Sequence, residues 1–303
     1  MTKASPSPAS PPDLSPDSTG AVARLVALLD VEPLEADLFR GQSTDPGWTR
    51  VYGGQVVAQA LMAASKTVRD RLAHSLHAYF LRPGDPAAPI VYRVERDRDG
   101  TSFATRRVVA IQHGRPIFNL AASFQVAETG FDHAAPMPRC PGPDGLRSER
   151  ELFAARADAT PEPYRTLWAT RERPVEFRPV ESHDPFKPKK TKPLGHHWFR
   201  AASAVPADPV LARALLAYAS DMTLLDTCLL PHAVSWSDPA LQAASIDHAM
   251  WFHATPDLNE WHLFAQDSPR ASNGRGLNRG MIFAQGGALV ASVAQEGLIR
   301  YRG

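Results

Sequence analysis

Two stretches of the chain, residues 56–65 and 211–220, are apolar on nearly every face and rich in alanine. A helix that is apolar all round is buried on all sides. Each stretch therefore predicts a helix inside the protein rather than on its surface. The small alanine side chains would also let strands approach these helices closely.

Runs typical of β-strands follow each predicted helix, and turn residues separate them. The turns are Asp99-Gly100, His113-Gly114 and Gly286-Gly287. The expected strands are 76–82, 89–98, 102–112 and 116–125 in the first half, and 246–253, 260–267, 276–285 and 288–298 in the second, with a short strand before each helix near 34–40 and 175–180. A buried helix followed by an antiparallel meander, twice in one chain, is an α+β pattern. A sheet wrapped around a central helix is the hotdog arrangement, so the predicted fold is a tandem double hotdog.

The two halves also align as an internal repeat. Ser75 and Gln125 stand against Ser245 and Gln295 at a constant offset of 170, and 50 residues separate serine from glutamine in both copies. The two helices match at an offset of 155, so the second copy carries a longer loop after its helix.

Proline and serine mark the segments outside the two halves. Residues 1–20 hold five Pro and five Ser with almost no apolar residue, which predicts a disordered tail. The first hotdog is expected over 21–130 and a proline-rich connector over 131–174, with one helical piece around 148–157. The second hotdog is expected over 175–303.

Charge and composition exclude several classes of protein. The formal net charge is +1, which provides no electrostatic footprint for nucleic acid or an anionic membrane. No run reaches the roughly 18 apolar residues of a membrane helix, and no apolar segment near Met1 indicates a secretory signal. Two cysteines, Cys140 and Cys228, are too few for a disulfide framework or a cysteine-based zinc site. The simplest expectation is a reduced, cytoplasmic enzyme or binding protein.

Several separated motifs, in order, resemble the type II acyl-CoA thioesterases, which include the bacterial thioesterase II enzymes and the peroxisomal acyl-CoA thioesterases. The motifs are Leu38-Phe-Arg-Gly-Gln42, Tyr52-Gly-Gly-Gln55, Tyr79-Phe-Leu-Arg-Pro-Gly-Asp85, Tyr218-Ala-Ser-Asp221, Ile246-Asp-His-Ala-Met-Trp-Phe-His253 and Gln295-Glu-Gly297. The resemblance covers roughly residues 25–300 and implies hydrolysis of acyl-CoA to a fatty acid and free CoA. It also implies no cofactor and a homo-oligomer, a dimer or tetramer of double hotdogs.

The resemblance further implies a water held by Asp221, Ser245 and Gln295, without a covalent intermediate. A carboxylate can take the proton of an attacking water, while a hydroxyl and an amide can fix its direction. In the repeat alignment, Lys66 stands where the second copy has Asp221. Because a protonated lysine cannot act as the base, one active centre per chain is expected, formed mainly by the second half.

Other features leave alternatives open. The double glycine before the first helix suggests that a backbone amide at Gly54 or Gln55 polarises the thioester carbonyl, although a tight turn explains it equally well. Asp247, His248 and His253 invite a metal interpretation, but 248 and 253 should face opposite sides of a strand, and a hydrogen-bonded histidine is preferred. A non-catalytic acyl-CoA binding module and a hotdog enoyl-CoA hydratase are the alternative functions. The hydratase is disfavoured because Asp221 has no histidine within one turn.

Overall fold

A computed structural model describes residues 18–44 and 49–303 of the chain. Most of the expected tail, residues 1–17, lies outside these described residues. The expected boundary at residue 20 is wrong, because helix α1 (Ser18–Leu29) already begins at Ser18. The sequence analysis missed α1, although its buried residues Ala21, Val22, Leu25 and Leu29 recur along one helical face.

The first half places helix α2 (Gly53–Ser65) against an antiparallel sheet. The expected strand near 34–40 is instead a tight hairpin, turned at Asp37, which has a positive φ of 59°. The strands are β1 (Glu32–Glu35), β2 (Leu38–Gly41), β3 (Leu72–Phe80), β4 (Ile90–Asp99), β5 (Phe103–Gln112) and β6 (Arg115–Gln125).

The second half repeats the arrangement around helix α5 (Pro209–Ser220). Two of its strands were not predicted: β8, and β9, which is separated from β10 at Ile246. The elements are β7 (Val175–Pro179), β8 (Leu194–Ala201), the 3₁₀ helix η2 (Leu224–His232), β9 (Leu241–Ser245), β10 (Asp247–Phe252), β11 (His262–Ser272), β12 (Arg275–Ala284) and β13 (Leu289–Tyr301).

The expected connector is more structured than its proline content suggested. It contains α3 (Glu149–Ala154), a 3₁₀ turn (Ala157–Ala159) and α4 (Tyr164–Thr170). Helix α3 begins with a capping box, in which the Ser148 hydroxyl accepts from the Glu151 amide and the Glu151 carboxylate accepts from the Ser148 amide.

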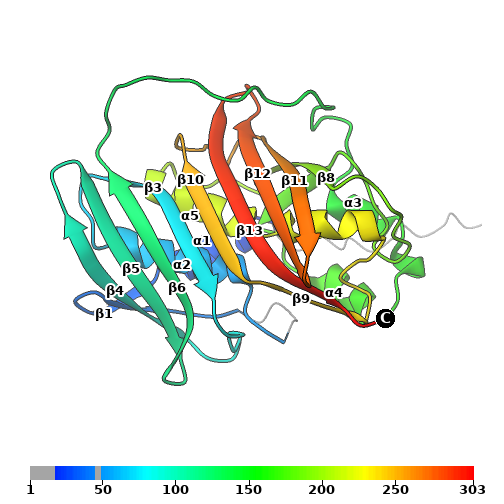
Figure 1. Cartoon of the computed structure of the whole chain (residues 1–303), viewed down its shortest axis with the longest axis horizontal. Coiled ribbons are helices and arrows are strands. Elements are labelled where there is room, and N and C mark those ends of the chain that lie inside the picture. Colours follow the sequence, from blue (N-terminus) through cyan, green and yellow to red (C-terminus); the bar gives the residue numbers. More distant parts are fainter. Residues whose placement is uncertain (1–17, 45–48) are drawn as a thin grey trace, which may run out of the picture.

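Both halves share one continuous sheet, with strand order β1-β2-β4-β5-β6-β3-β10-β13-β12-β11-β8-β7 and β9 beside β13. The halves join where β3 and β10 pair antiparallel. Helices α1, α2 and α5 lie on the same side of this sheet (Figure 1). The sheet and the two central helices form one shared core, so the double hotdog expected from the sequence is confirmed.

The two central helices begin differently. At α5, the Asp208 carboxylate accepts hydrogen bonds from the amides of Val210 (2.8 Å) and Leu211 (3.2 Å), and Pro209 occupies the first turn. At α2, the N-cap residue Tyr52 provides no side-chain hydrogen bond. The amides of Gly53 and Gly54 therefore remain available to partners outside the helix, whereas the Gln55 amide donates to the Tyr52 carbonyl.

No helix in the described part of the chain is both long and apolar enough to cross a membrane.

Candidate active site

Asp221 is the C-cap residue of α5 and lies against the start of α2 from the other half. A Cβ atom added at Gly53 would lie 2.7 Å from Asp221 Oδ2. Only a glycine lets the backbone of α2 approach the carboxylate this closely. The Asp221 side chain is 6% exposed, so the two halves together shield it from water.

Gln295 and Ser245 meet Asp221 at this point. The Gln295 Nε2 donates to Asp221 Oδ1 at 2.5 Å and to Ser245 Oγ at 3.1 Å. A carboxylate only accepts hydrogen bonds, which fixes the orientation of the amide. Ser245 is the last residue of β9. The three residues expected from the resemblance thus come together from α5, β9 and β13.

Burial raises the pKa of Asp221 to about 6. Hydrogen bonds from Gln295 and from the Gly54 amide, and the positive charge of Arg50, act in the opposite direction. Desolvation disfavours the charged carboxylate more than these partners favour it. A carboxylate with this pKa is still mainly ionised at neutral pH and is a stronger base than a solvated aspartate.

Two residues near Asp221 were missed as site residues by the sequence analysis. The Tyr52 hydroxyl donates to the Tyr218 carbonyl at 2.8 Å, which ties the start of α2 to the end of α5. Arg50 donates to the carbonyl of Ala243 at 3.0 Å and lies close enough to affect the Asp221 pKa. The position of Tyr52 in the motif Tyr52-Gly-Gly-Gln55 was the available signal, whereas Arg50 lies outside the motifs.

A cavity of about 1340 Å³ opens in front of Asp221 and Ser245. This exceeds the roughly 300–1,000 Å³ of most small-molecule sites. Gln295 is fully buried behind Asp221 and Ser245. Helices α1, α3 and α4 supply apolar lining that includes Leu25, Leu28, Phe153, Leu167 and Trp168. The segment expected to be only a connector therefore forms part of the cavity wall.

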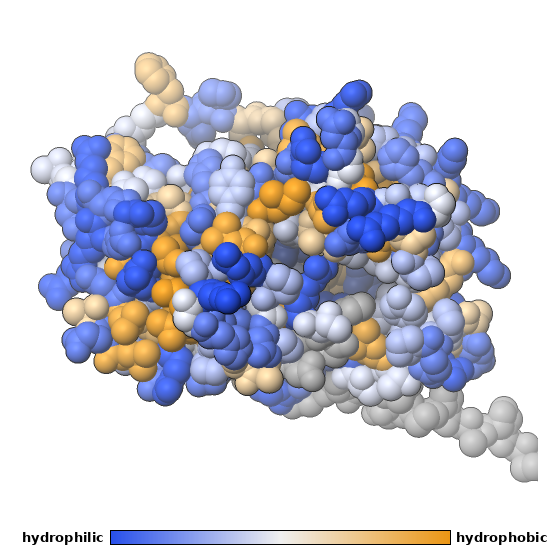
Figure 2. Space-filling view, turned by 60° about the horizontal axis from the view of Figure 1, so that its bottom comes forward, coloured by the Kyte–Doolittle hydropathy of each residue, from blue (hydrophilic) through white to orange (hydrophobic). Residues whose placement is uncertain are grey.

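The cavity is also lined by charged groups, among them Arg24, Arg50, Arg82, Arg171 and Lys189. The face of the molecule in Figure 2 is mainly hydrophilic, with separate apolar patches between the charged groups. Carboxylates line the cavity as well, among them Glu149, Glu172 and Asp184. The lining thus combines an apolar interior with charged groups of both signs, which suits a ligand with an apolar part and a charged part.

The matching residues of the first half do not form a second site. The Lys66 ammonium binds the Asp30 carboxylate at 2.7 Å, and the Gln125 side chain donates to Glu128 at 3.0 Å. The Gln125 side chain also faces the side of the sheet away from the core, because its neighbour Phe124 is the residue that is buried against the core. The 170-residue offset therefore aligns two glutamines that point in opposite directions.

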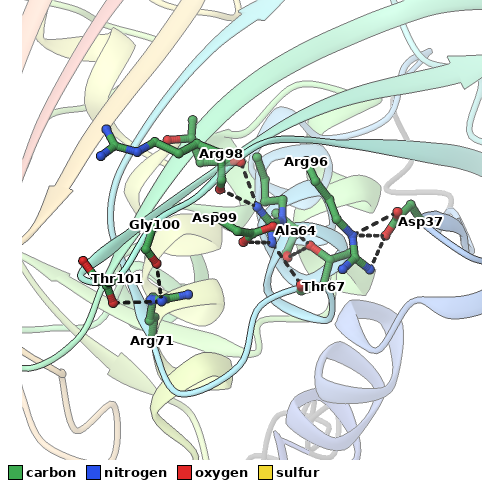
Figure 3. A network of polar contacts seen from close by, with 11 residues as sticks. Asp37, Ala64, Thr67, Arg71, Arg96, Arg98, Asp99, Gly100 and Thr101 are labelled. Carbon is green, nitrogen blue, oxygen red and sulfur yellow. Dashed lines mark hydrogen bonds and ion pairs between the residues drawn. The ribbon is translucent and has the colours of Figure 1, made fainter.

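Thr67, just after α2, and Asp99 lie close together (Figure 3) and both bind a buried arginine, Arg106. Arg106 is 1% exposed and donates from Nε to Thr67 Oγ1 at 2.8 Å and from Nη2 to the Thr67 carbonyl at 3.2 Å. Its guanidinium also binds Asp99 Oδ1 at 2.6 Å. A cation at a helix C-terminus is favourable for the helix dipole. The first half thus ends its central helix with a structural cation, and the second half ends its helix with a carboxylate.

His248, on β10, and His253, directly after this strand, face opposite sides of the sheet, as expected. His248 is fully buried, whereas His253 is exposed and contacts Ser292 Oγ at 2.9 Å. Within residues 18–44 and 49–303, no three His, Cys, Asp or Glu side chains are grouped as a metal site requires. His248 Nδ1 lies 4.0 Å from Asp221 Oδ1. Asp221 has no histidine within one turn of the chain, as expected, but the fold brings His248 close to it from β10.

Gly54→Ala tests the close contact between the halves. An added Cβ would lie 2.5 Å from the Tyr218 carbonyl oxygen and 2.6 Å from the Tyr52 ring. Since backbone must move, we expect a loss of about 1–3 kcal/mol in the free energy of unfolding and a marked fall in activity. Urea unfolding and kcat/KM measure both effects. Gly130→Ala is the control, because an added Cβ there has no neighbour within 4 Å. If both variants had the same free energy of unfolding and the same kcat/KM, the close approach of α2 to the end of α5 would not require a glycine at position 54.

The architecture makes the chain a tandem hotdog protein with a buried carboxylate facing a large cavity. A hot dog fold structure from Alicyclobacillus acidocaldarius has a TM-score of 0.74 over 92% of this chain and 99% of that chain, at 18% identity, and supports the fold alone. The family description "Acyl-CoA thioesterase" matches residues 166–298, and "Acyl-CoA thioesterase N-terminal domain" matches residues 44–125.

Relatives covering nearly the whole chain carry the same name. Acyl-CoA thioesterase 2 of Haemophilus influenzae is 44% identical over 278 residues, which are 91% of this chain and 97% of that protein. Human acyl-coenzyme A thioesterase 8 is 39% identical over 286 residues, with 92% and 89% covered. The crystal structure of the acyl-CoA thioesterase II TesB2 from Mycobacterium marinum has 41% identity and a TM-score of 0.75, with 92% and 99% covered. The chain belongs to the acyl-CoA thioesterase family and is a thioester hydrolase.

Proposed function

We propose that Asp221 acts as the general base on a water molecule that Ser245 and Gln295 help to hold, and that this water attacks the acyl-CoA thioester directly. The observation that carries the proposal is the convergence of the three side chains, with Asp221 and Ser245 at the cavity wall and Gln295 directly behind them. Gln295 Nε2 lies 2.5 Å from Asp221 Oδ1 and 3.1 Å from Ser245 Oγ. These groups come from three separate elements, so the chain places them together only through its tertiary fold.

The reaction balances with these groups alone. As the water oxygen bonds to the thioester carbon, its proton passes to the Asp221 carboxylate. The C–S bond then breaks, and the proton reaches the departing thiolate, leaving a fatty acid and free CoA. A thiolate is a good leaving group, so no strong acid at sulfur is required. The Ser245 hydroxyl and the Gln295 amide fix the direction of attack.

The carbonyl oxygen needs hydrogen-bond donors as negative charge develops. The amide at Gly54 or Gln55 stays our prediction for this role. Here the Gly54 amide binds Asp221, and the Gln55 amide donates to the Tyr52 carbonyl at 3.2 Å. To act in an oxyanion hole, the Gly54 amide must therefore leave the Asp221 carboxylate when that group becomes protonated. It can then donate a hydrogen bond to the substrate carbonyl oxygen. A product complex with the carboxylate far from the start of α2 would contradict this assignment.

The substrate is an acyl-CoA, with the acyl chain in the apolar part of the cavity and one wall supplied by the first half. We retain a cytoplasmic homo-oligomer, a dimer or tetramer of double hotdogs, as a prediction. Light scattering after size-exclusion chromatography tests the oligomer, and a monomer at micromolar concentration would contradict it.

Release of free thiol from acyl-CoAs of different chain length tests the proposed function. We expect release for at least one chain length. The binding-module alternative predicts binding without thiol release, and the hydratase alternative predicts hydration of an enoyl-CoA instead. His248 does not line the cavity, so the Asp221–His248 pair is not presented to a substrate as a hydratase would require.

The pH dependence of the same reaction tests the base. Burial raises the pKa of Asp221 to about 6, and only the ionised carboxylate accepts the proton. We therefore expect kcat/KM to fall as pH decreases through about 6 and to level off above pH 7. An acid limb near pH 4, typical of a solvated aspartate, would contradict the role of this buried group.

A further inference from the structure

We propose that His248 is a positioning residue for Asp221, and that its Nδ1–H donates a hydrogen bond to Asp221 Oδ1 when substrate fills the cavity. The inference rests on the proposed role of Asp221 as the base. His248 lies on β10, directly behind the carboxylate and away from the cavity lining. It therefore acts on the reaction through Asp221 rather than by touching the substrate.

The geometry of the imidazole carries the proposal. His248 is 0% exposed, and its Nδ1 has no hydrogen-bond partner. A buried polar nitrogen without a partner is costly. The polar atom facing it is Asp221 Oδ1, at 4.0 Å. Catalytic hydrogen bonds are often long in the free enzyme and shorten in the substrate complex, so a shift of about 1 Å by the carboxylate completes this contact.

The tautomer of His248 depends on the contact made by its other ring nitrogen. His248 Nε2 lies 2.9 Å from Ser220 Oγ, and Ser220 immediately precedes Asp221 at the end of α5. When the Ser220 hydroxyl donates to Nε2, the single imidazole proton resides on Nδ1, facing the carboxylate. Ser220 Oγ also lies 2.9 Å from the Ala217 carbonyl, which is the competing acceptor for that proton.

The charge state of the ring is compatible with this role. Burial lowers the pKa of His248 to about 4, so the imidazole is neutral wherever the enzyme is assayed. The other polar groups facing Asp221 are Gln295 from β13, Ser245 from β9, the Gly54 amide from α2, and Arg50 and Tyr52 from the preceding loop. None of these groups contacts His248 Nδ1. Among the described residues, His248 is therefore the donor that can reach the carboxylate from this side.

Two substitutions separate the two ring nitrogens. In His248→Asn the amide nitrogen takes the place of Nδ1 and can donate to Asp221. In His248→Gln the amide nitrogen takes the place of Nε2. This variant keeps the hydrogen bond to Ser220 and loses the hydrogen bond to Asp221. We expect His248→Gln to lower kcat/KM about tenfold or more and to move the acid limb upward by about half a pH unit, because a donor to the carboxylate is lost. The kcat/KM of His248→Asn should stay within about threefold of the wild-type value, and the acid limb of its pH profile should not move.

His262→Gln is the matched control, because His262 is also buried (1% exposed) and lies outside the cavity lining. It should lower the melting temperature without moving the acid limb. If His248→Gln keeps the wild-type pH profile, or if His248→Asn is the more damaged variant, His248 does not position Asp221. Asp221→Asn distinguishes this failure from failure of the proposed function: an active Asp221→Asn would overturn the role of Asp221 itself.

The wild-type enzyme provides an independent measurement that does not depend on the folding of a variant. In ¹⁵N-histidine-labelled protein, the shifts of the His248 ring nitrogens report which one carries the proton. We expect the Nδ1–H tautomer with a non-hydrolysable acyl-CoA analogue bound. Observation of the Nε2–H tautomer in that complex would overturn the proposal.

Discussion

Asp221→Asn is expected to reduce kcat/KM at least about 100-fold while making the folded protein more stable at pH 8. The loss of activity follows from removal of the base without a change of shape. The gain in stability follows from the burial that raises the pKa of this carboxyl from 3.8 to about 6. The shift corresponds to about 3 kcal/mol, at about 1.4 kcal/mol per pKa unit, and sets an upper bound on the gain.

The pH dependence of this gain has a defined sign. A carboxyl whose pKa is raised by folding destabilises the folded protein fully above the folded pKa, and the penalty disappears below the unfolded pKa. The stability difference between Asp221→Asn and the wild type should therefore be largest above pH 6 and shrink as pH falls towards 3.8. Urea unfolding at pH 8, 6 and 4.5 measures it. An Asp221→Asn protein that hydrolyses acyl-CoA normally would remove Asp221 from the mechanism.

Gln295→Ala is expected to lower kcat/KM by about 100-fold, whereas Gln125→Ala should leave it nearly unchanged. Gln295 is fully buried and bridges Asp221 and Ser245. Its hydrogen bond lowers the pKa of Asp221, so its removal should also move the acid limb of kcat/KM upward. The free energy of unfolding should fall by about 1–3 kcal/mol, because buried polar groups lose a partner.

Gln125 is a matched control because it has the same side chain at the aligned position of the repeat. Its amide donates to Glu128 and lies on the less buried side of β6. The measurement is kcat/KM between pH 5 and 9, with circular dichroism to confirm folding. If Gln125→Ala proved as damaged as Gln295→Ala while still folded, the single active centre would be wrong and both halves would share the chemistry.

The sequence by itself determined the architecture and the chemical difference between the two halves. Ten of the thirteen residues of α2 are buried, as its uniformly apolar pattern required. The exchange of Asp221 for Lys66 was visible in the repeat, because the residue type at the end of each central helix does not depend on the fold. The motifs also supplied the residues that the structure brings together at the cavity.

Only the tertiary structure decided which side chains face one another. The equal spacing of the two glutamines suggested equivalent positions, but the strand irregularities of the two copies do not share the 170-residue offset. The register of β6 shifts between Pro116 and Phe118, and that of β13 shifts between Leu289 and Ala291, 173 residues further on. A shift of one residue along a strand moves a side chain to the other face of the sheet. Gln125 and Gln295 consequently diverge despite their identical spacing.

The contacts of Asp221 could not be predicted from the sequence either. Gly54 and His248 lie 167 residues before it and 27 residues after it in the chain, on elements that no local pattern connects to α5. Their proximity depends on the pairing of β3 with β10, which sets α2 beside α5. Sequence patterns report the local period of helices and strands, whereas the raised pKa of Asp221 arises from burial between two halves that only the folded chain brings together.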